Sequence, residues 1–540
     1  MKIRKIRIKN YKLITDATIC VNPDTNIFVG QNDSGKSTIL EALAILTSGK
    51  LNGYAFERQI KANLFNFEAR KAYRTSLADP DNVLSPPTIE LEAYCDSTDA
   101  LYSGSNNYYG EDTAGIRAVV EFNTEYADTY KSMLMRGDIY DIPVEFYSVS
   151  YKYFNGGTVS YRFCPIKAAF IDTTRKDYAY IVDRFVADNI TTYLSTKEQI
   201  DLSTAFRKGR NDFHTNDVVV KLNESVKDHV HIGKKALSID LKEEDVDEWK
   251  SQMSVIVDET PFENVGFGSQ NTIKIELALK NSAEQVNMIL MEEPENNLSF
   301  SNMAQLIKHV EESEGKQVFI STHSSYVANK LNLGNIFLVS NGFVTPFNAL
   351  SDDTRKYFIK LPGYDTLRLV LAEKAILVEG PTDELILQKA YKDTYHRLPA
   401  DDGIDIIVVD SLAFKRYCDI AVLLKKKTIV VTDNDGDIVK NIKTKYSEYL
   451  ATGFLHFFYE KDEALNTIEP SVLFVNSDAN GPTKSFRKAI SINNSFGDKS
   501  ADEILAFMTH NKAEWAMRVF ESETEIAYPR YIEDAIKEYN

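Results

Sequence analysis

The sequence predicts an α/β protein with two domains, each built on parallel strands that end in polar residues. The chain has 540 residues, which exceeds what one hydrophobic core usually organises. In the first half, an apolar run at residues 27–29 leads into a glycine-rich loop and then a helix-forming run. In the second half, apolar runs alternate with helical stretches, which predicts a parallel sheet. We place the two domains at residues 1–350 and 351–540.

The composition is typical of a globular protein from a reducing compartment. The four cysteines are scattered without C-x-x-C spacing, which argues against a disulfide framework and a zinc site. No apolar run approaches the roughly 20 residues that span a bilayer, so we expect a cytoplasmic protein with no membrane partner. The net charge of −17 disfavours a nucleic-acid partner, but a local groove can still be basic.

The glycine-rich loop at residues 30–37 reads G-x-x-x-x-G-K-S. In this pattern, backbone N–H groups and a helix N-terminus hold phosphates, while the lysine reaches the β- and γ-phosphates. A glycine-rich turn without a nucleotide is the alternative, and the flanking strand and helix disfavour it. We therefore expect ATP to bind at Asn32, Gly35, Lys36, Ser37 and Thr38, with the Ser37 hydroxyl as a Mg²⁺ ligand.

The regions around this loop predict further elements. Strands at residues 2–8 and 17–21 precede the loop. Strand-like runs follow the loop helix and predict an inserted antiparallel lobe, at residues 88–94, 116–122, 144–153 and 158–163. Residues 176–254 carry apolar residues at helical spacing, which predicts a helical insertion. This insertion either pads the core or forms a dimerisation arm.

Paired carboxylates follow an apolar strand at residues 288–291. Glu292 would hold Mg²⁺ directly or through water, and Glu293 would orient the water that attacks the γ-phosphate. The strand at residues 317–322 ends at His323, where a histidine can hydrogen-bond the γ-phosphate. Each feature alone could be a solvated turn or a structural histidine. Their order after the phosphate loop favours a function.

Residues 267–272 form a small-residue turn that opens a helix at residues 273–280. With the phosphate loop, the Glu-Glu strand and the His strand, this turn makes residues 1–345 resemble ABC-type ATPases of the SMC and recombination-repair branch. The resemblance implies that Ser269 and Gln270 contact ATP held by a second subunit, and hence a homodimer or tetramer. The turn departs from the family's L-S-G-G-Q.

The second domain begins with a strand at residues 375–378, followed by Glu379 and a helix that carries Asp383. A later strand at residues 428–432 runs into three aspartates, Asp433, Asp435 and Asp437. Ligands gather at the carboxyl ends of parallel strands, so these side chains would converge. Such a cluster needs a cation, and oxygen ligands suit Mg²⁺ or Mn²⁺. An EF-hand is excluded because its twelfth position holds Thr444.

Glu-Gly after one strand and Asp-x-Asp after a later one resemble the Toprim fold of topoisomerases, primases and nucleases. An ABC-type ATPase followed by Toprim is the architecture of OLD (overcoming lysogenization defect) family nucleases, and the chain is most similar to the Gabija-type phage-defence branch. Residues 465–470 and 511–516 resemble the family's L-x-T-L-E stretch and late lysine motif. The fold class is thus an ABC/SMC-like P-loop ATPase with a helical insertion, then a Toprim domain with a C-terminal helical extension.

This resemblance implies ATP-controlled, metal-dependent cleavage of DNA. Glu379, Asp433 and Asp435 would be catalytic and would bind metal with Asp383, Asp437 and Glu469. Lys512 would neutralise charge on the phosphate, or is only a solvated helix residue. An operon-encoded partner, either a helicase or a reverse transcriptase with a noncoding RNA, is also implied.

Two alternatives from other classes stay open. One is an SMC-type ATP-driven structural protein, although residues 176–254 are too short and irregular for long coiled coils. The other is a Toprim enzyme of the topoisomerase or primase type. A topoisomerase needs a nucleophilic-tyrosine domain and a primase needs a template-binding module, and no motif for either is visible.

Overall fold

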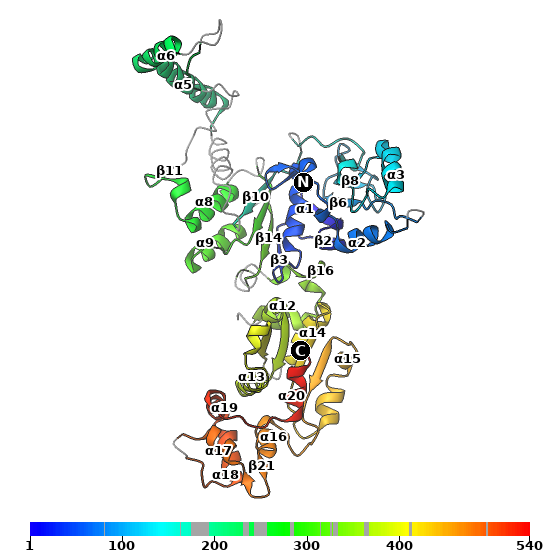
Figure 1. Cartoon of the computed structure of the whole chain (residues 1–540), viewed down its shortest axis with the longest axis vertical. Helices are drawn as coiled ribbons and strands as arrows, with labels where there is room; N and C mark the ends of the chain where they lie inside the picture. Colours follow the sequence, from blue (N-terminus) through cyan, green and yellow to red (C-terminus); the bar gives the residue numbers. More distant parts are fainter. Residues whose placement is uncertain are drawn as a thin grey trace.

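The computed structural model describes residues 1–79, 82–161, 164–173, 194–229, 237–241, 256–280, 286–296, 298–313, 315–324, 327, 333–360, 367–409, 413–492 and 495–539. Two lobes are stacked along the longest axis, and a helical hairpin projects from the first lobe (Figure 1). None of the helices in these ranges is long and apolar enough to cross a membrane.

The first lobe contains a sheet with the strand order β10-β13-β14-β3-β15-β16. The first five strands are parallel, and β16 adds an antiparallel edge. Their bounds are β3 (Thr25–Val29), β10 (Ala168–Asp172), β13 (Met288–Glu292), β14 (Gln317–Thr322), β15 (Ile336–Ser340) and β16 (Phe343–Pro346). Every residue of β13 is buried, which explains its continuous apolar run.

A second, antiparallel sheet has the order β2-β1-β6-β8-β7, with β9 paired to β8. The strands are β1 (Ile3–Tyr11), β2 (Ile14–Cys20), β6 (Ile89–Cys95), β7 (Ser103–Gly104), β8 (Thr113–Phe122) and β9 (Tyr147–Tyr153). The two strands that precede the phosphate loop thus belong to this sheet, and the expected inserted lobe is only part of it. The pairing of β1 with β6 is non-local, so sequence periodicity could not reveal it.

The expected strands at the end of this sheet are shorter than predicted. Residues Val144–Phe146 form a 3-10 turn, and β9 begins at Tyr147. At the predicted strand 158–163, Thr158 forms only an isolated bridge with Lys152, and residues 162–163 lie outside the described part.

Helix α1 (Lys36–Ser48) lies between the two sheets and contacts strands of both. All its residues except Ser37 and Ser48 are buried, as expected of a helix that is apolar around most of its circumference. The loop at its N-terminus is therefore fixed by packing on two sides.

Helices cover the outer surfaces of the first lobe. Helix α8 (Phe267–Lys280) packs on α9 (Phe300–Glu311) beside β10. Helices α2 (Phe67–Ser76) and α3 (Ala127–Arg136) lie at the far end of the antiparallel sheet (Figure 1). Helices α5 (Thr196–His214) and α6 (Asp217–His229) form the projecting hairpin. The rest of the expected helical insertion, residues 176–193, 230–236 and 242–254, lies outside the described residues.

The second lobe is a four-stranded parallel sheet with the order β18-β17-β19-β20, as the alternating pattern predicted. Its strands are β17 (Lys374–Val378), β18 (Ile404–Val408), β19 (Thr428–Val431) and β20 (Leu455–Phe458). The helices are α13 (Pro381–Tyr395), α14 (Phe414–Leu423), α15 (Ser447–Leu450), α16 (Ile468–Val475), α17 (Lys484–Ile490), α18 (Ala501–His510), α19 (Lys512–Glu521) and α20 (Arg530–Lys537).

A continuous apolar core joins the lobes. It runs from Val29 in β3 through Phe347 and Phe358 to Leu377 in β17. The connecting segment contains α11 (Asp352–Lys360) and α12 (Arg368–Leu371). Because this core is shared, the second sheet is packed against the first lobe rather than tethered by a bare linker.

Candidate functional site

The phosphate loop connects the end of β3 to the start of α1. Gly35 adopts φ 110° as the N-cap of α1, a conformation that favours glycine. At Gly30, a Cβ would lie 2.1 Å from the Val339 carbonyl oxygen, so a side chain does not fit. The loop therefore ends at a helix N-terminus whose first backbone N–H groups lack helical acceptors, which is the arrangement that binds phosphate.

Lys36 points back across this loop. Its Nζ donates hydrogen bonds to the carbonyl oxygens of Gly30 (2.8 Å) and Gln31 (2.7 Å), and lies 3.8 Å from Glu293 Oε1. Burial lowers the pKa of Lys36, while Glu293 and the neighbouring acids partly oppose that shift. Of the other expected ATP contacts, Asn32 is exposed, Ser37 half-buried and Thr38 buried.

The adjacent strands β13 and β14 bring Glu293 and His323 together. Glu293 Oε2 lies 2.5 Å from His323 Nδ1 and accepts the backbone N–H of His323 at 3.2 Å. Glu292 ends β13 and is buried. Thr173 directly follows β10, the strand next to β13, and its Oγ1 donates a hydrogen bond to the Glu292 carbonyl oxygen at 2.9 Å. The predicted lysine, carboxylate and histidine thus share one edge of the sheet.

Glu295 belongs to the same group, although sequence reasoning did not single it out. Its Oε1 accepts hydrogen bonds from Thr322 Oγ1 (2.5 Å) and from the backbone N–H of Ser324 (3.1 Å). Burial and the neighbouring Glu293 raise the pKa of Glu295 to about 7. Within the described ranges, Glu293, Glu295 and His323 are the one set of three or more His, Cys, Asp or Glu side chains whose ligand atoms all lie within 4.8 Å of one another. The sequence signal that could have identified Glu295 is the third carboxylate of the run E-E-P-E at residues 292–295.

The Gly-Ser-Gln turn lies in the first turn of α8, which begins at Phe267, earlier than predicted. Gln270 is buried, and its Nε2 donates to the carbonyl oxygens of Phe262 (3.0 Å) and Val265 (2.8 Å). Ser269 is exposed. Gln270 is therefore held within its own chain, whereas Ser269 lies on the surface.

The phosphate loop also contacts the second lobe. Gln31 Nε2 donates to the carbonyl oxygens of Ala372 and Leu371, the latter at 3.3 Å. Lys426 Nζ, from the other side, donates to Ala372 as well and to Leu369 at 2.8 Å. Since Ala372 lies just before β17, a phosphate-loop residue touches the backbone that leads into the second sheet.

The second candidate site lies at the carboxyl edge of that sheet. Glu379 directly follows β17, and its Oε1 accepts hydrogen bonds from Thr432 Oγ1 (2.5 Å) and the backbone N–H of Asp433 (3.2 Å). In the first turn of α13, Asp383 Oδ2 accepts the backbone N–H of Gly380 at 3.0 Å. The strand-end prediction thus places these three carboxylates correctly beside one another.

Two members of this carboxylate cluster have raised pKa values. Burial and the nearby Glu379 raise the pKa of Asp383 to about 7. Burial and the charges of Asp383, Glu379 and Glu469 raise the pKa of Asp433 to about 9. Burial is the largest cause of both shifts, and repulsion between the neighbouring carboxylates adds to it.

The loop after β19 places the remaining aspartates differently. Asp435 is exposed, adopts φ 50° and donates its backbone N–H to Asn466 at 3.2 Å. Buried Asn434 donates to the carbonyl oxygens of Glu460 (2.9 Å) and Asp462 (3.0 Å), which fixes the loop. Asp437 is exposed, and its Oδ1 accepts the backbone N–H of Lys440 at 2.9 Å. Asp437 therefore caps the following turn.

Glu469 and Lys512 complete the cluster from the C-terminal helices. Glu469 is buried at the start of α16, and its Oε2 accepts a hydrogen bond from Thr467 Oγ1 at 2.7 Å. Its Oε1 is buried without a hydrogen bond from the described residues and lies 3.8 Å from Lys512 Nζ. The Lys512 side chain is 59% exposed at the first position of α19. The motifs at residues 465–470 and 511–516 thus lie next to each other at the carboxyl edge of the second sheet.

Tyr531 is a neighbour that sequence reasoning missed. It is buried on α20, and burial together with Asp433 and Asp383 raises the pKa of its phenol. Nothing in the local sequence of a C-terminal helix indicates such a position, because only folding returns α20 to the sheet.

These residues fit a divalent metal centre. The set offers only oxygen ligands, and the buried Glu469 Oε1 has no hydrogen-bond donor among the described residues. Oxygen-rich sets of this kind suit Mg²⁺ and Mn²⁺. A bound cation would also remove the repulsion that raises the pKa of Asp433.

Comparison with protein families identifies two regions. Residues 1–74 match an AAA ATPase domain, and residues 370–435 match the TOPRIM domain of overcoming lysogenization defect-like proteins. The predicted resemblance to OLD-type proteins that pair an ATPase with Toprim is confirmed, and so is the α/β fold class.

Curated relatives match shorter stretches. The DNA replication and repair protein RecF of Chlamydia caviae is 40% identical over 50 residues, which is 9% of this chain and 14% of RecF. The endonuclease GajA of Bacillus cereus is 28% identical over 195 residues, which is 29% of this chain and 28% of GajA. The chain thus matches 14% of the length of RecF and 28% of the length of GajA, less than a third of either.

Among solved structures, the SMC head bound to the C-terminal winged helix of ScpA aligns over 64% of this chain and 97% of its own, at 15% identity and a TM-score of 0.34. The structure of RecF with ATP aligns over 64% of this chain and 97% of RecF, at 11% identity and a TM-score of 0.31.

Proposed function

We propose that this chain is an ATP-hydrolysing, metal-dependent DNA endonuclease that acts in bacterial defence against phages. The convergence of Glu379, Asp383, Asp433 and Glu469 at one edge of a parallel sheet carries the proposal. The match of residues 370–435 to an OLD-like TOPRIM domain, and the likeness to an endonuclease, support it. We assign the ATPase to residues 1–350 and the nuclease to residues 351–540.

At the carboxylate cluster, the chain's own residues would bind and position the metal ions and DNA. Glu379, Asp433 and Asp435 would be the principal ligands, and Asp383, Asp437 and Glu469 would complete the set. Divalent cations held there would supply an activated water and stabilise the leaving oxygen. Lys512 at the exposed rim would meet the negative charge that develops on the phosphate.

At the phosphate loop, Lys36 would exchange its carbonyl acceptors for the phosphates of ATP. Ser37 and Glu292 would hold Mg²⁺. Glu293, oriented by His323, would position the attacking water. The half-buried Glu295 would hold the His323 backbone in place, since it accepts that N–H at 3.2 Å.

Two surfaces support a homodimer or tetramer. Ser269 is exposed at the start of α8, where it would contact ATP bound to a second subunit. The hairpin of α5 and α6 exposes apolar side chains that it cannot bury alone, among them Ile200, Phe213, Val218 and Leu222. We propose that this hairpin is a dimerisation arm. An operon-encoded helicase or reverse transcriptase with a noncoding RNA is proposed as a further partner.

The contact between Gln31 and Ala372 supports control of the nuclease by ATP. Lys36 holds the Gln31 carbonyl while the Gln31 side chain holds the backbone before β17, and Glu379 follows that strand. If a bound phosphate draws Lys36 away from Gln31, the contact between Gln31 and Ala372 would change as well. Strand β17 connects Ala372 to Glu379 of the carboxylate cluster, so the change could reach that cluster.

The test is cleavage of supercoiled plasmid by the full chain in Mg²⁺ or Mn²⁺, with and without ATP. We expect Glu379→Ala and Asp433→Ala each to lower cleavage by about 10³-fold, because the remaining ligands cannot hold two ions. ATP hydrolysis should survive in both variants, since the phosphate loop lies in the other lobe. Glu448→Ala, an exposed carboxylate of the same lobe, is the matched control.

The product separates the nuclease from other Toprim enzymes. A nicked circle that stays open after the protein is removed indicates hydrolysis, whereas relaxed but closed circles would indicate a topoisomerase. Cleavage at the wild-type rate by both carboxylate variants would contradict the nuclease assignment. Calcium should support DNA binding without comparable cleavage.

A further inference from the structure

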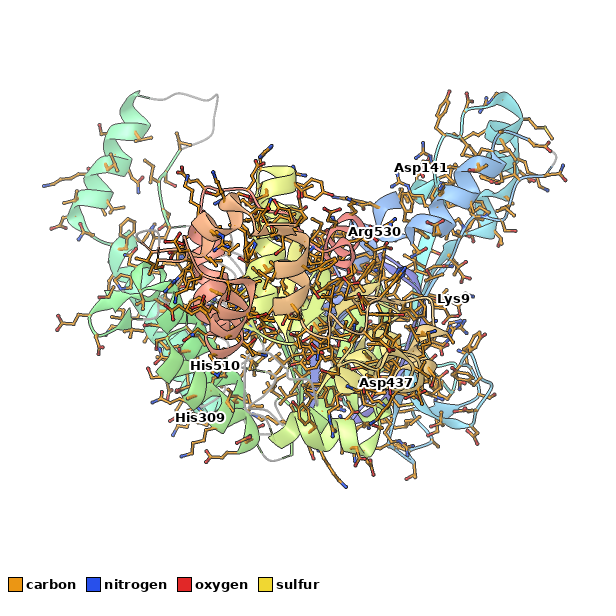
Figure 2. All side chains as sticks on the ribbon, turned by 90° about the horizontal axis from the view of Figure 1, so that it is seen from below. Lys9, Asp141, His309, Asp437, His510 and Arg530 are labelled. Carbon is orange, nitrogen blue, oxygen red and sulfur yellow. The ribbon has the colours of Figure 1, made fainter. Side chains whose placement is uncertain are left out.

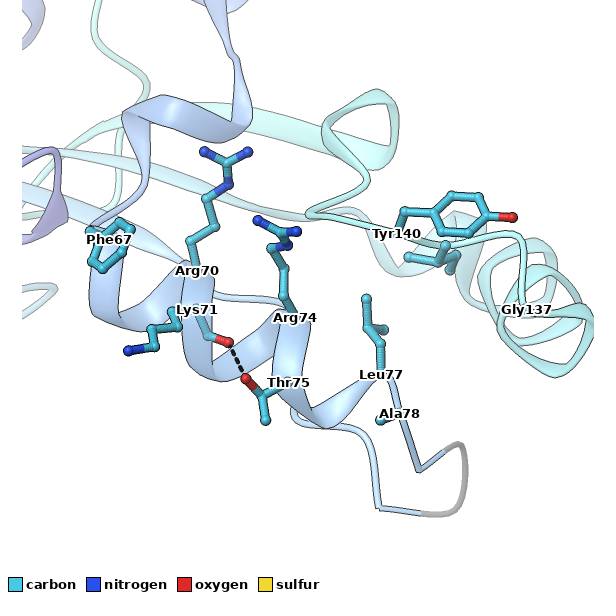
Figure 3. Close-up of a pocket in the computed structure, with 10 residues that line it drawn as sticks. Phe67, Arg70, Lys71, Arg74, Thr75, Leu77, Ala78, Gly137 and Tyr140 are labelled. Carbon is cyan, nitrogen blue, oxygen red and sulfur yellow. Dashed lines mark hydrogen bonds between the residues drawn. The ribbon is translucent and has the colours of Figure 1, made fainter.

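A cavity of about 640 Å³ opens on the first lobe, at the outer end of the antiparallel sheet (Figure 3). One face of α2 and the loop after α3 form its walls. The lining residues are Phe67, Arg70, Lys71, Arg74, Thr75, Leu77, Ala78, Gly137, Ile139 and Tyr140. The opposite face of α2 is anchored in the core through buried Tyr73. The helix that lines the cavity, α2, is thus held in place by core packing of its opposite face.

The wall of this cavity is basic in a chain whose net charge is −17. Arg70 is bound through two nitrogens to Asp141, whose pKa this guanidinium holds below its usual range. Lys71 and Arg74 are exposed, and within the described part neither forms an ion pair with a carboxylate. Two positive charges therefore face solvent beside a positioned arginine, which favours a ligand with phosphate groups.

Aromatic rings flank these cations. Phe67 is 66% exposed and Tyr140 is 78% exposed, and Figure 3 shows them on either side of Arg70 and Arg74. Large exposed rings at the border of a cavity are costly in water and indicate a surface that is covered by a ligand. The bases of a duplex are already stacked on each other, so only unpaired bases offer their faces to such rings.

We infer that this cavity, formed by α2 and the loop after α3, binds single-stranded nucleic acid, with Lys71 and Arg74 on phosphates and Phe67 and Tyr140 stacked on bases. The site is separate from the carboxylate cluster. Asp141, which binds Arg70 of the cavity, and Asp437, in the loop of the carboxylate cluster, lie far apart in Figure 2. Helix α2 and the second lobe are likewise separate in Figure 1. The inference goes beyond the proposed function because it concerns binding, and it stands whether or not the second lobe cuts DNA.

The test measures binding of the full chain to a labelled strand of about 20 thymidines by fluorescence anisotropy, in EDTA to prevent cleavage. Lys71→Glu with Arg74→Glu should weaken binding at least tenfold and reduce the salt slope by about 1.4, which corresponds to two phosphate contacts. Phe67→Ala with Tyr140→Ala should weaken binding about fivefold or more but leave duplex binding unchanged. Lys131→Glu on α3, outside the cavity, is the matched control.

A photo-crosslink from an iodinated thymidine strand gives a second, position-specific readout, and we expect it to fall on the peptides that contain Phe67 or Tyr140. The inference is overturned if the wild-type chain does not bind the strand, or if the Lys131 control weakens binding as much as the cavity variants. Equal loss of duplex binding in the aromatic variant would also overturn it. Competition by thymidine monophosphate as strong as that of the strand would assign a free nucleotide instead.

Discussion

The phosphate-loop site and the carboxylate cluster both lie where neighbouring parallel strands end, and they differ in how negative charge is balanced. At the first site, Lys36 and the N-terminus of α1 stand opposite Glu293, and His323 contacts the same carboxylate. At the second site, buried Asp383 and Glu469 gather with half-buried Asp433, and the cation of Lys512 lies at the exposed rim.

Acids with raised pKa values occur at both sites: Glu295 at the first and Asp383 at the second are each raised to about 7, and Asp433 is raised further. Around the phosphate loop, Lys36 and the N-terminus of α1 accompany the acids, which suits an anionic ligand. At the cluster, burial and the charges of Asp383, Glu379 and Glu469 raise the pKa of Asp433 to about 9. The first site therefore pairs its acids with a lysine and a helix N-terminus, whereas at the second site we propose that divalent cations balance the carboxylates.

The largest expected effect on ATP hydrolysis comes from Lys36→Ala. Removing this cation should lower ATP hydrolysis by about 10²- to 10³-fold, because no other side chain takes its place at the phosphates. Binding of Mn²⁺ to the carboxylate cluster, measured by titration calorimetry without ATP, should be unchanged. Lys50→Ala, an exposed lysine just after α1, is the control. Hydrolysis at the wild-type rate would end the assignment of the phosphate loop.

Glu293→Gln should separate ATP binding from hydrolysis. The amide keeps the size of the side chain but cannot act as a carboxylate toward His323 and the attacking water. We expect hydrolysis to fall about 10²-fold, while nucleotide binding persists and the ATP-bound dimer accumulates. Light scattering with ATP measures the mass. A monomer across micromolar concentrations would contradict both the dimer and the role of the Gly-Ser-Gln turn.

A smaller effect is expected at the rim of the second site. Lys512→Ala should slow DNA cleavage about 10-fold, because the developing charge on the phosphate loses one neighbouring cation. Lys512→Arg should restore part of the rate, and DNA binding in Ca²⁺ should stay near the wild-type level. Lys484→Ala on α17, an exposed lysine of the same helical extension, serves as control. An unchanged rate in Lys512→Ala would make this lysine a solvated helix residue.

The sequence was sufficient for features that depend on strand ends and spacing. Gly35 and Lys36 follow from the loop pattern, and Glu379 and Asp433 follow from the rule that parallel strands end at one edge. The boundary of α8 and the sheet membership of β1 were wrong or incomplete because both depend on partners distant in the chain.

Contacts between separate segments were beyond sequence reasoning. Tyr531 reaches the carboxylate cluster only because α20 returns to β20 and β19 after the helical extension. The contact of Gln31 with Ala372 joins residues that are 341 positions apart. Asp437 matched the spacing of a ligand, but its Oδ1 accepts the N–H of Lys440, and only the fold of that loop reveals this capping hydrogen bond.

The smallest expected effect, and the one most specific to the charge difference, is the pH dependence of metal stabilisation. The pKa values of about 7 for Asp383 and about 9 for Asp433 lie above the ordinary value of about 3.9. Without a cation, the folded chain therefore binds more protons than the unfolded chain between about pH 4 and 9, and its stability falls as the pH rises through that window. A bound divalent cation favours the ionised carboxylates and opposes this loss.

The melting temperature in EDTA should accordingly fall between about pH 5.5 and 8.5, and Mn²⁺ should raise it by a few degrees more at the higher pH. Asp433→Asn removes the group with the most raised pKa in the cluster, so the increment from Mn²⁺ should shrink and lose most of its pH dependence. Because Glu295 at the first site also has a raised pKa, of about 7, the wild-type profile alone does not identify the site, and the comparison with Asp433→Asn does. An equal increment at both pH values in the wild-type chain would contradict the proposal that divalent cations balance the charge of the carboxylate cluster.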